Sequence, residues 1–293
     1  MSFSRMLIFF FSRLIVLITA KSSLPPLYFC LDKGYFSNDS TYESNLNGLL
    51  STLSSNPEIN HTGFCSTSLG QNDDDTVNAI ALCRRDITTK ECISCIDVAT
   101  RVFPEICPNQ KESILWYDIC MLRFSNRSIS RKMEIDPSMG FFNNISVPES
   151  ERTQFYTALS ELMDNLASRV KFADSRHNFA AGNVSLGSNK ALYVMVQCTP
   201  DLAGERCSDC LFLAYDYIIS YGSTGGKVFA PSCQLRYEMY LFFEPDALDM
   251  SEPPQVRPTP PISPTISTSS PPTRTSGTIG NVKKLNILFS LFM

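Results

Sequence analysis

The stretch CRRDITTKECISC, at Cys83–Cys95, decides the fold of this chain because it has a counterpart, CTPDLAGERCSDC, at Cys198–Cys210. Both stretches space three cysteines as C-x8-C-x2-C, and Cys120 and Cys233 follow the third cysteine of each stretch after 25 and 23 residues. The tripeptide at 68–70, Ser-Leu-Gly, also recurs at 185–187. A repeat with a period of about 115 residues predicts two tandem modules of similar structure.

Each copy begins with an amphipathic segment whose apolar side chains recur every three or four residues, which is typical of a helix packed on a core. These side chains are Leu46, Leu49, Leu50 and Leu53 in the first copy, and Phe155, Leu159, Leu162, Leu166 and Val170 in the second.

Apolar and β-branched runs predict strands before and after each cysteine stretch. These runs are Val77–Leu82 and Leu192–Gln197 before it, and Ile114–Phe124 and Lys227–Phe243 after it. A second helix is expected from each CxxC pair onward. We therefore predict an α+β fold of two small disulfide-stapled modules, each an antiparallel sheet with two helices. The first module is placed at residues 28–130 and the second at 140–245, with a linker at 131–140.

Residues 1–20 have the features of a secretory signal peptide: Arg5, an apolar run at Met6–Ile18, and small residues at Thr19-Ala20. All eleven cysteines follow this segment, and in an oxidising compartment most of them should form disulfides. Five glycosylation sequons agree with secretion, at Asn38, Asn60, Asn126, Asn144 and Asn183. We expect an extracellular protein.

Residues 246–293 change to a Pro/Ser/Thr-rich composition, which predicts a disordered tail. The tail has a short apolar end, Leu285–Met293, which is too short to span a bilayer. An alternative to free secretion is a GPI anchor on the outer face of the plasma membrane, with cleavage near Ser276 or Gly277.

Composition disfavours several classes of function. A net charge of −4 without basic runs disfavours nucleic-acid binding. Two histidines give little material for a catalytic or metal-binding constellation. We therefore expect a protein that is not an enzyme and that has no cofactor and no metal.

The cysteine spacing, with Cys107 and Cys120 continuing it, resembles the ginkbilobin-homologous or stress-antifungal domain of plants. This domain occurs in cysteine-rich repeat secretory proteins and in the ectodomains of cysteine-rich receptor-like kinases. The phrases Trp116–Cys120, Pro231–Cys233 and Arg236–Glu238 are similar to the family as well. The resemblance covers residues 28–130 and 140–245.

The resemblance implies five disulfides: Cys30–Cys107, Cys83–Cys92, Cys95–Cys120, Cys198–Cys207 and Cys210–Cys233. The second copy lacks both partners of the bridge that corresponds to Cys30–Cys107, so it is expected to be the less stable module. Cys65 is left over. It is expected to be a buried free thiol where relatives more often have an aromatic residue, although an odd cysteine can also cross-link chains.

The CxxC pairs allow two other interpretations, a thioredoxin-like redox pair and a zinc site formed by Cys92, Cys95, Cys207 and Cys210. Both need free thiols. Each pair has further cysteines upstream and downstream with which it can form disulfides, so we favour neither.

The resemblance also implies a carbohydrate site, because the antifungal type of this family binds mannose through an Asn, an Arg and a Glu. The first copy has Leu31, Ile114 and Ser125 at these positions, which cannot form the site. The second copy has Lys227 and Glu238 at the last two positions, and counting back from its first helix places the Asn near Asn144, which is itself a sequon. A salt bridge between Lys227 and Glu238 on a solvent-facing sheet is the alternative interpretation.

Three functions stay open at this point. The first is a secreted protein of plant defence or stress response that binds mannose-type glycans through its second module. The second is a cell-surface interaction module that binds an extracellular protein partner and is related to receptor-kinase ectodomains but lacks the kinase. The third is a redox sensor that uses Cys65 or a labile bridge.

Overall fold

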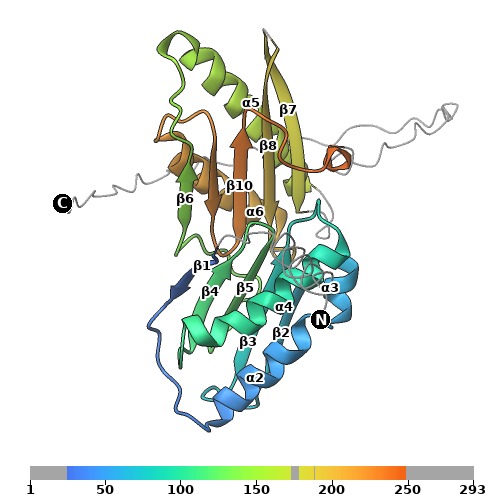
Figure 1. Ribbon diagram of the computed structural model, residues 1–293, viewed down its shortest axis with the longest axis vertical. Helices are drawn as coiled ribbons and strands as arrows, with labels where there is room; N and C mark the ends of the chain where they lie inside the picture. The colour runs from blue at the N-terminus through green and yellow to red at the C-terminus, as the bar shows by residue number, and fades with distance from the viewer. Residues whose placement is uncertain (1–24, 173–177, 188, 249–293) are drawn as a thin grey trace, which may run out of the picture. The chain divides into compact units, whose positions relative to one another are not determined.

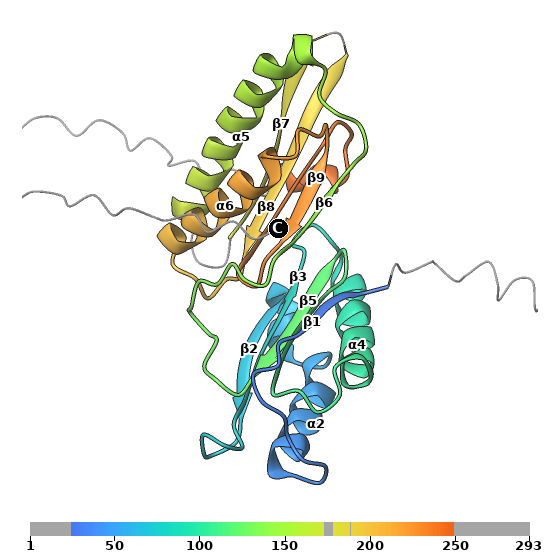
Figure 2. The same ribbon diagram turned by 90° about the vertical axis from the view of Figure 1, so that its left-hand side faces the viewer.

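Each half of the molecule is a five-stranded antiparallel sheet with helices packed on one face (Figures 1 and 2). The computed structural model describes residues 25–172, 178–187 and 189–248, which all belong to one compact unit. The expected signal peptide, the GPI signal and the tail beyond residue 248 lie outside the described residues.

The first module has the strand order β1-β4-β5-β3-β2. Its elements are β1 (Leu27–Cys30), α2 (Thr41–Leu53), α3 (Pro57–Thr62), β2 (Phe64–Leu69), β3 (Val77–Cys83), α4 (Thr89–Ile106), β4 (Glu112–Trp116) and β5 (Cys120–Ser125). The short helix α3 is an addition to the two expected helices.

The second module repeats this topology in the order β6-β9-β10-β8-β7. Its elements are β6 (Met139–Phe142), α5 (Arg152–Phe172), β7 (Phe179–Gly187), β8 (Lys190–Cys198), α6 (Gly204–Ile219), β9 (Gly226–Phe229) and β10 (Cys233–Glu238). The predicted α+β class with two tandem modules is therefore confirmed. The strands β1, β2, β6 and β7 were not placed from the sequence.

The helix that carries each CxxC pair explains the repeated cysteine spacing. Residues three apart lie on the same face of a helix, so Cys92 and Cys95 both point from α4 toward the sheet. Helix α4 begins with a capping box in which Thr88 and Glu91 satisfy each other's backbone N–H groups. Helix α6 repeats the arrangement with Cys207 and Cys210 on its buried face.

The five disulfides have the same pairs as the family resemblance implies. They join Cys83 to Cys92, Cys95 to Cys120, Cys198 to Cys207, Cys210 to Cys233, and Cys30 to Cys107. The thiol of Cys65 is free and belongs to the core of the first module. Burial raises the pKa of this thiol, which lowers the fraction of reactive thiolate at neutral pH.

The repeated Ser-Leu-Gly tripeptide ends β2 and β7, each just before a turn into the next strand. Gly70 and Gly187 both have a positive φ, of 120° and 79°. A Cβ atom at Gly70 would lie 2.6 Å from the Cα of Thr76, so only glycine fits there.

The connection between the modules, at residues 126–138, is more than a linker. Glu134 forms ion pairs with Arg123 of β5 and with Arg127 at the start of the connection itself. The backbone N–H of Glu134 donates to Ser232 Oγ of the second module, over 2.9 Å. Strand β6 begins at Met139, within the stretch that was expected to be the linker.

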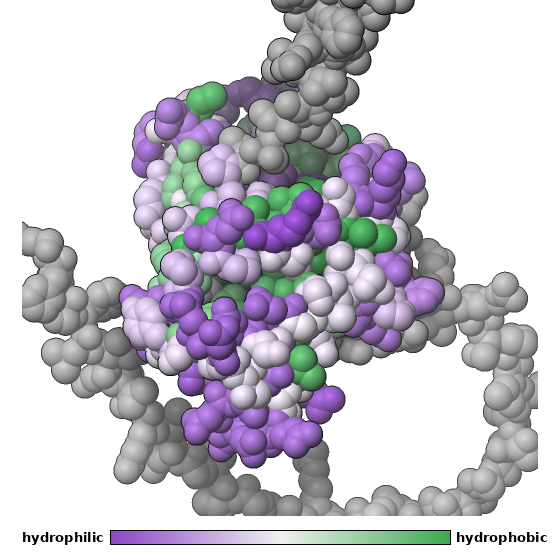
Figure 3. Space-filling view, turned by 60° about the horizontal axis from the view of Figure 1, so that its bottom comes forward, coloured by the Kyte–Doolittle hydropathy of each residue, from purple (hydrophilic) through white to green (hydrophobic). Residues whose placement is uncertain are grey.

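An apolar cluster joins the two modules. Trp116 of β4 stacks on Phe229 of β9, with ring centroids 6.1 Å apart, and both rings are almost fully buried. The buried side chain of Gln197 donates from Nε2 to the carbonyl of Cys83, over 2.9 Å. In a view that brings the first module toward the reader, hydrophobic residues gather in the middle of the surface, between hydrophilic ones (Figure 3).

Within the three described ranges, no helix is long and apolar enough to cross a membrane.

Candidate functional site

A cleft of about 560 Å³ lies where the outer face of the second sheet meets the first module. The outer face is the face of a sheet that its own helices do not cover. The first module contributes Pro25, Leu27, Trp116, Tyr117 and Asp118 to the lining of the cleft. The second module contributes Phe141, Phe142, Asn143, Gly225, Gly226, Lys227, Phe229, Arg236 and Glu238. The cleft therefore combines an aromatic wall with a cluster of charged groups.

Strand register identifies equivalent positions in the two modules. Cys30 of β1 pairs with Ser113, and Phe142 of β6 pairs with Gly226, so Phe142 takes the place of Cys30. The next residues are equivalent as well, because Leu31 N–H donates to the carbonyl of Glu112 and Asn143 N–H donates to that of Gly225. The second-module equivalent of Leu31 is thus Asn143.

This equivalence corrects the candidate Asn144. Asn144 is exposed and does not line the cleft, whereas Asn143 does. The count back from the helix was wrong by one residue because the loops between strand and helix differ between the copies. The register of β6 on β9 identifies Asn143 instead. The sequon remains at Asn144, so its glycan acceptor is the neighbouring side chain.

Asn143, Lys227 and Glu238 all line the cleft, and Asn143 and Glu238 meet over Gly225. A Cβ atom built on Gly225 would lie 2.2 Å from Glu238 Oε2 and 2.6 Å from Asn143 Nδ2, so both side chains extend over this glycine. Asn143 Oδ1 accepts from Ser223 Oγ and from the backbone N–H of Ile145. The amide nitrogen of Asn143 therefore faces Glu238, which places a donor next to an acceptor.

Lys227 does not pair with Glu238. The Lys227 ammonium binds Asp118 of the first module and lies 4.3 Å from the ring centroid of Phe229. Glu238 instead accepts from Arg236 over 3.0 Å. The alternative of a direct Lys227–Glu238 salt bridge is therefore wrong, because each group has another partner.

Charge and burial compete at Asp118 and Lys227. Burial by itself raises the pKa of Asp118, but the cations Lys227, Arg84 and Arg236 outweigh it and lower the pKa below its usual value. Burial lowers the pKa of Lys227, and Asp118 offsets only part of this effect. The charged form of the Asp118 carboxylate is therefore favoured. Burial of Lys227, by contrast, disfavours the charged form of its ammonium group.

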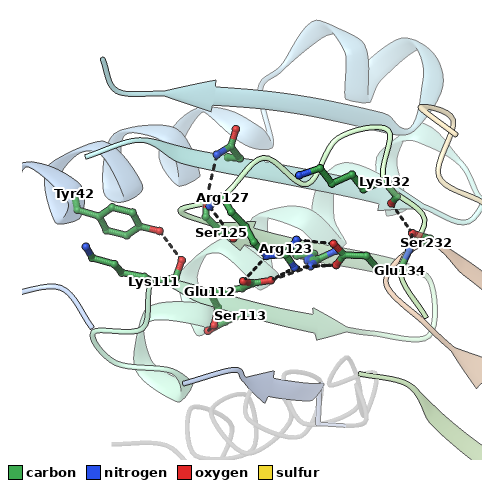
Figure 4. Close-up of polar contacts among 11 residues, drawn as sticks. Tyr42, Lys111, Glu112, Ser113, Arg123, Ser125, Arg127, Lys132, Glu134 and Ser232 are labelled. Carbon is green, nitrogen blue, oxygen red and sulfur yellow. Dashed lines mark hydrogen bonds and ion pairs between the residues drawn. The ribbon is translucent and has the colours of Figure 1, made fainter. Parts of the chain in front are cut away.

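In the first module, charged side chains cover the equivalent outer face of the sheet. Arg123, the equivalent of Arg236, binds Glu112 over 2.9 Å and also binds Glu134 of the connecting segment (Figure 4). Arg127 binds the same two glutamates. Ile114 and Ser125, the equivalents of Lys227 and Glu238, are completely buried. The first module therefore has no open site at this position.

Sequence patterns marked two further residues of the cleft, Arg236 and Asp118, although neither was a candidate site residue. Arg123 and Arg236 both lie three residues after the last cysteine of their module, and Asp118 lies within the family-like phrase Trp116–Cys120. Neither signal shows what the side chain contacts. The contact of Asp118 with Lys227 depends on how the two modules pack, which no repeat pattern contains.

The other predicted glycosylation sites lie on the surface or close to it. Asn38, Asn60 and Asn183 are exposed, and Asn126 is partly exposed. Among the described residues, no group of three or more His, Cys, Asp or Glu side chains is arranged to hold a metal ion.

Two segments of the chain match one protein-family model. Residues 29–127 and 143–240 each match the model described as salt stress response/antifungal. The chain belongs to this family. The two matched segments correspond to the two modules of the structure.

Curated relatives from Arabidopsis thaliana share both modules. The chain is 37% identical over 218 residues to cysteine-rich repeat secretory protein 38, which covers 73% of this chain and 83% of that protein. It is 35% identical over 236 residues to cysteine-rich receptor-like protein kinase 29, covering 80% of this chain and 34% of the kinase. The chain thus spans about a third of the length of the receptor-like kinases that it matches.

Two solved structures have a similar fold. The tandem DUF26 ectodomain of the Arabidopsis thaliana cysteine-rich receptor-like protein PDLP8 gives a TM-score of 0.61 at 18% identity, covering 74% of this chain and 98% of that one. The equivalent ectodomain of PDLP5 gives 0.57 at 22% identity, covering 74% and 99%. These likenesses support the fold of the two modules.

Proposed function

We propose that this family member is an extracellular saccharide-binding protein whose site lies in its second module. The observation that supports this proposal is the meeting of Asn143, Lys227 and Glu238 in one cleft, because an amide, an ammonium and a carboxylate are the groups that bind sugar hydroxyls. Phe141 is 42% exposed beside them and offers an apolar surface to the C–H face of a sugar ring.

The extracellular location is supported by the secretory relative and by the receptor-like relatives, together with the five disulfides. A role in plant defence or stress response is proposed from the family alone. The cleft combines few polar groups with an aromatic wall, as binding sites for small ligands generally do. We propose a binding role and not a catalytic one.

A glycan array that includes mannose polymers tests the proposal, with the secreted chain carried beside a Glu238→Ala variant and a Gly225→Ala variant. The Cβ atom of alanine at position 225 would clash with the side chains of Glu238 and Asn143 and displace them. This variant therefore disturbs the site without removing any of its polar groups. We expect binding by the wild-type chain and a loss of at least tenfold in both variants. Glu161→Ala, an exposed change on α5, is the control and should bind normally.

Binding that survives Glu238→Ala and Gly225→Ala would contradict the site. If the correctly folded chain binds no saccharide, the proposal fails. The second candidate would then be favoured: a cell-surface interaction module that binds an extracellular protein, which is supported by the receptor-like kinases among the relatives.

A further inference from the structure

The cation end of the cleft is already occupied by a side chain from the first module. Asp118, in the turn between β4 and β5, binds Lys227. Its Oδ2 atom lies 3.3 Å from Arg84 Nη1, and its Oδ1 atom lies 3.9 Å from Arg236 Nη1. Three cations therefore converge on one carboxylate. This carboxylate is 46% exposed, although Lys227 and Arg236 beside it are only 19% and 16% exposed.

The first module shows the same arrangement in a closed form. There the arginine, Arg123, binds one carboxylate of its own sheet, Glu112, and a second one from a neighbouring segment, Glu134. In the second module Arg236 binds Glu238 of its own strand, and the second carboxylate is Asp118 from the other module. Glu134 is 19% exposed and Asp118 is 46% exposed. Each outer face thus receives one carboxylate from outside its own sheet, and the second face leaves this carboxylate more exposed to solvent.

We propose that Asp118 is an exchangeable occupant of the site and that the ligand is a saccharide with a carboxylate group, which replaces Asp118 on Lys227 and Arg236. This inference rests on the proposed saccharide site and names the class of sugar that it selects. The hydroxyls of the same sugar bind Glu238 and Asn143, which lie next to the cations in the cleft.

Charge favours this exchange. Arg84 also pairs with the buried Asp86, over 2.5 Å, and Arg236 pairs with Glu238. When Asp118 turns away, Arg84 keeps the negative charges of Asp86 and Glu244, and Arg236 keeps Glu238. The Lys227 ammonium then loses its carboxylate in a partly desolvated cleft. A neutral sugar leaves that charge unpaired, whereas a uronic acid neutralises it.

The exchange needs only a side-chain rotation. The turn that carries Asp118 is held by its backbone, because Tyr117 N–H donates to the carbonyl of Cys120 over 2.8 Å. Trp116, just before it, stays stacked on Phe229 between the modules. The carboxylate can therefore leave the cations without separating the two modules.

The test compares a hexuronic acid oligomer with the same oligomer after methyl esterification of its carboxyls, by calorimetric titration into the full secreted chain. Mannotriose serves as a neutral reference. The variants are Asp118→Asn and, as a matched control, Asp97→Asn. Asp97 is 48% exposed and pairs with Arg101 on the surface of α4, away from the cleft.

We expect the wild-type chain to bind the acidic oligomer at least tenfold more tightly than its ester, with an affinity that falls as salt is raised. Removing the competing carboxylate in Asp118→Asn should tighten binding of the acidic oligomer about fivefold and leave the ester unchanged. Asp97→Asn should behave as the wild type. Circular dichroism and thiol titration establish that each variant is folded with its disulfides intact.

Equal affinity for acid and ester would overturn the inference. So would weaker binding of both oligomers by Asp118→Asn, because Asp118 would then be a group that contacts the sugar. If these results come with binding that is lost in Glu238→Ala, the proposed saccharide site stands and only the acidic selectivity fails. If none of the saccharides binds, both fail together.

Discussion

The two modules have the same strand order and the same arginine at the same place, but they use the outer face of the sheet differently. In the first module Arg123 is 2% exposed and lies under the connecting segment, which supplies Glu134. In the second module Arg236 is 16% exposed and faces an open cleft. The first module uses this face to hold the connection between the modules, and the second leaves it open as a cleft.

The modules also differ in how the first strand is attached. In the first module Cys30 of β1 is joined by a disulfide to Cys107 at the end of α4. In the second module Phe142 takes the place of Cys30 and stacks on Tyr221, just after α6, with ring centroids 3.7 Å apart. An aromatic stack thus replaces a covalent link near the cleft. An aromatic pair contributes about 0.5–1.5 kcal/mol beyond its burial, which is less than a disulfide that closes a long loop.

The largest effect is expected when the covalent link is removed from the first module. The bridge Cys30–Cys107 spans 77 residues, and the chain-entropy estimate for such a loop is about 4–5 kcal/mol. The double variant Cys30→Ser/Cys107→Ser should lose about this much free energy of unfolding. Fluorescence of Trp116, the single tryptophan of the chain, follows this module in a urea titration.

An unchanged fluorescence midpoint in the double variant would contradict the assigned role of the bridge. Far-UV circular dichroism gives the comparison with the second module, which has no equivalent bridge among the described residues. The midpoint of unfolding that circular dichroism reports for the second module should shift less than the midpoint that the fluorescence of Trp116 reports.

A smaller loss of stability is expected at acid pH, through Glu134, the carboxylate that covers the outer face of the first sheet. Burial by itself raises the pKa of Glu134, but hydrogen bonds and charge from Arg127 and Arg123 outweigh it and lower the pKa to about 2, from an ordinary value of 4.5. Because the folded state has the lower pKa, the stabilisation is complete above about pH 4.5 and is lost as the pH falls toward 2. Urea unfolding at pH 6, 4 and 3 should show this loss.

The variant Glu134→Gln removes the titrating group and serves as the comparison. Its stability should be lower than that of the wild type at pH 6, and the difference should shrink at pH 3. Parallel pH profiles of the two chains would show that Glu134 does not close the first module in this way.

The smallest effect is expected at the aromatic stack of the second module. The change Tyr221→Ala should cost about 1 kcal/mol, because Tyr221 is 54% exposed and loses its stack on Phe142 together with its edge contact to Tyr217. Tyr28→Ala in β1, at a residue that is 45% exposed, is the matched control and should cost less. Equal losses in the two variants would mean that the stack does not replace the missing disulfide.

Periodicity placed α2 and α5, because buried faces recur every three or four residues in a helix. The CxxC pairs placed α4 and α6, and apolar, β-branched runs placed the central strands. These patterns did not place β1, β2, β6 and β7, which are short or mixed in polarity. The candidate sugar residues Lys227 and Glu238 came from fixed offsets to cysteines. Asn143 was missed by one position, since the loop before α5 has no cysteine to anchor the count.

The sequence by itself determined the duplication, the α+β class and the family, because cysteine spacing and apolar periodicity are local properties of the chain. Only the tertiary structure decided that Glu134 closes the first module and that Asp118 faces the site of the second. Asp118 and Lys227 are 109 residues apart in the chain, whereas Glu134 binds arginines only 11 and 7 residues away. Both sets of contacts depend on how two sheets and a connecting segment pack together. Local patterns do not record that packing, so the character of the cleft could be established only from the folded molecule.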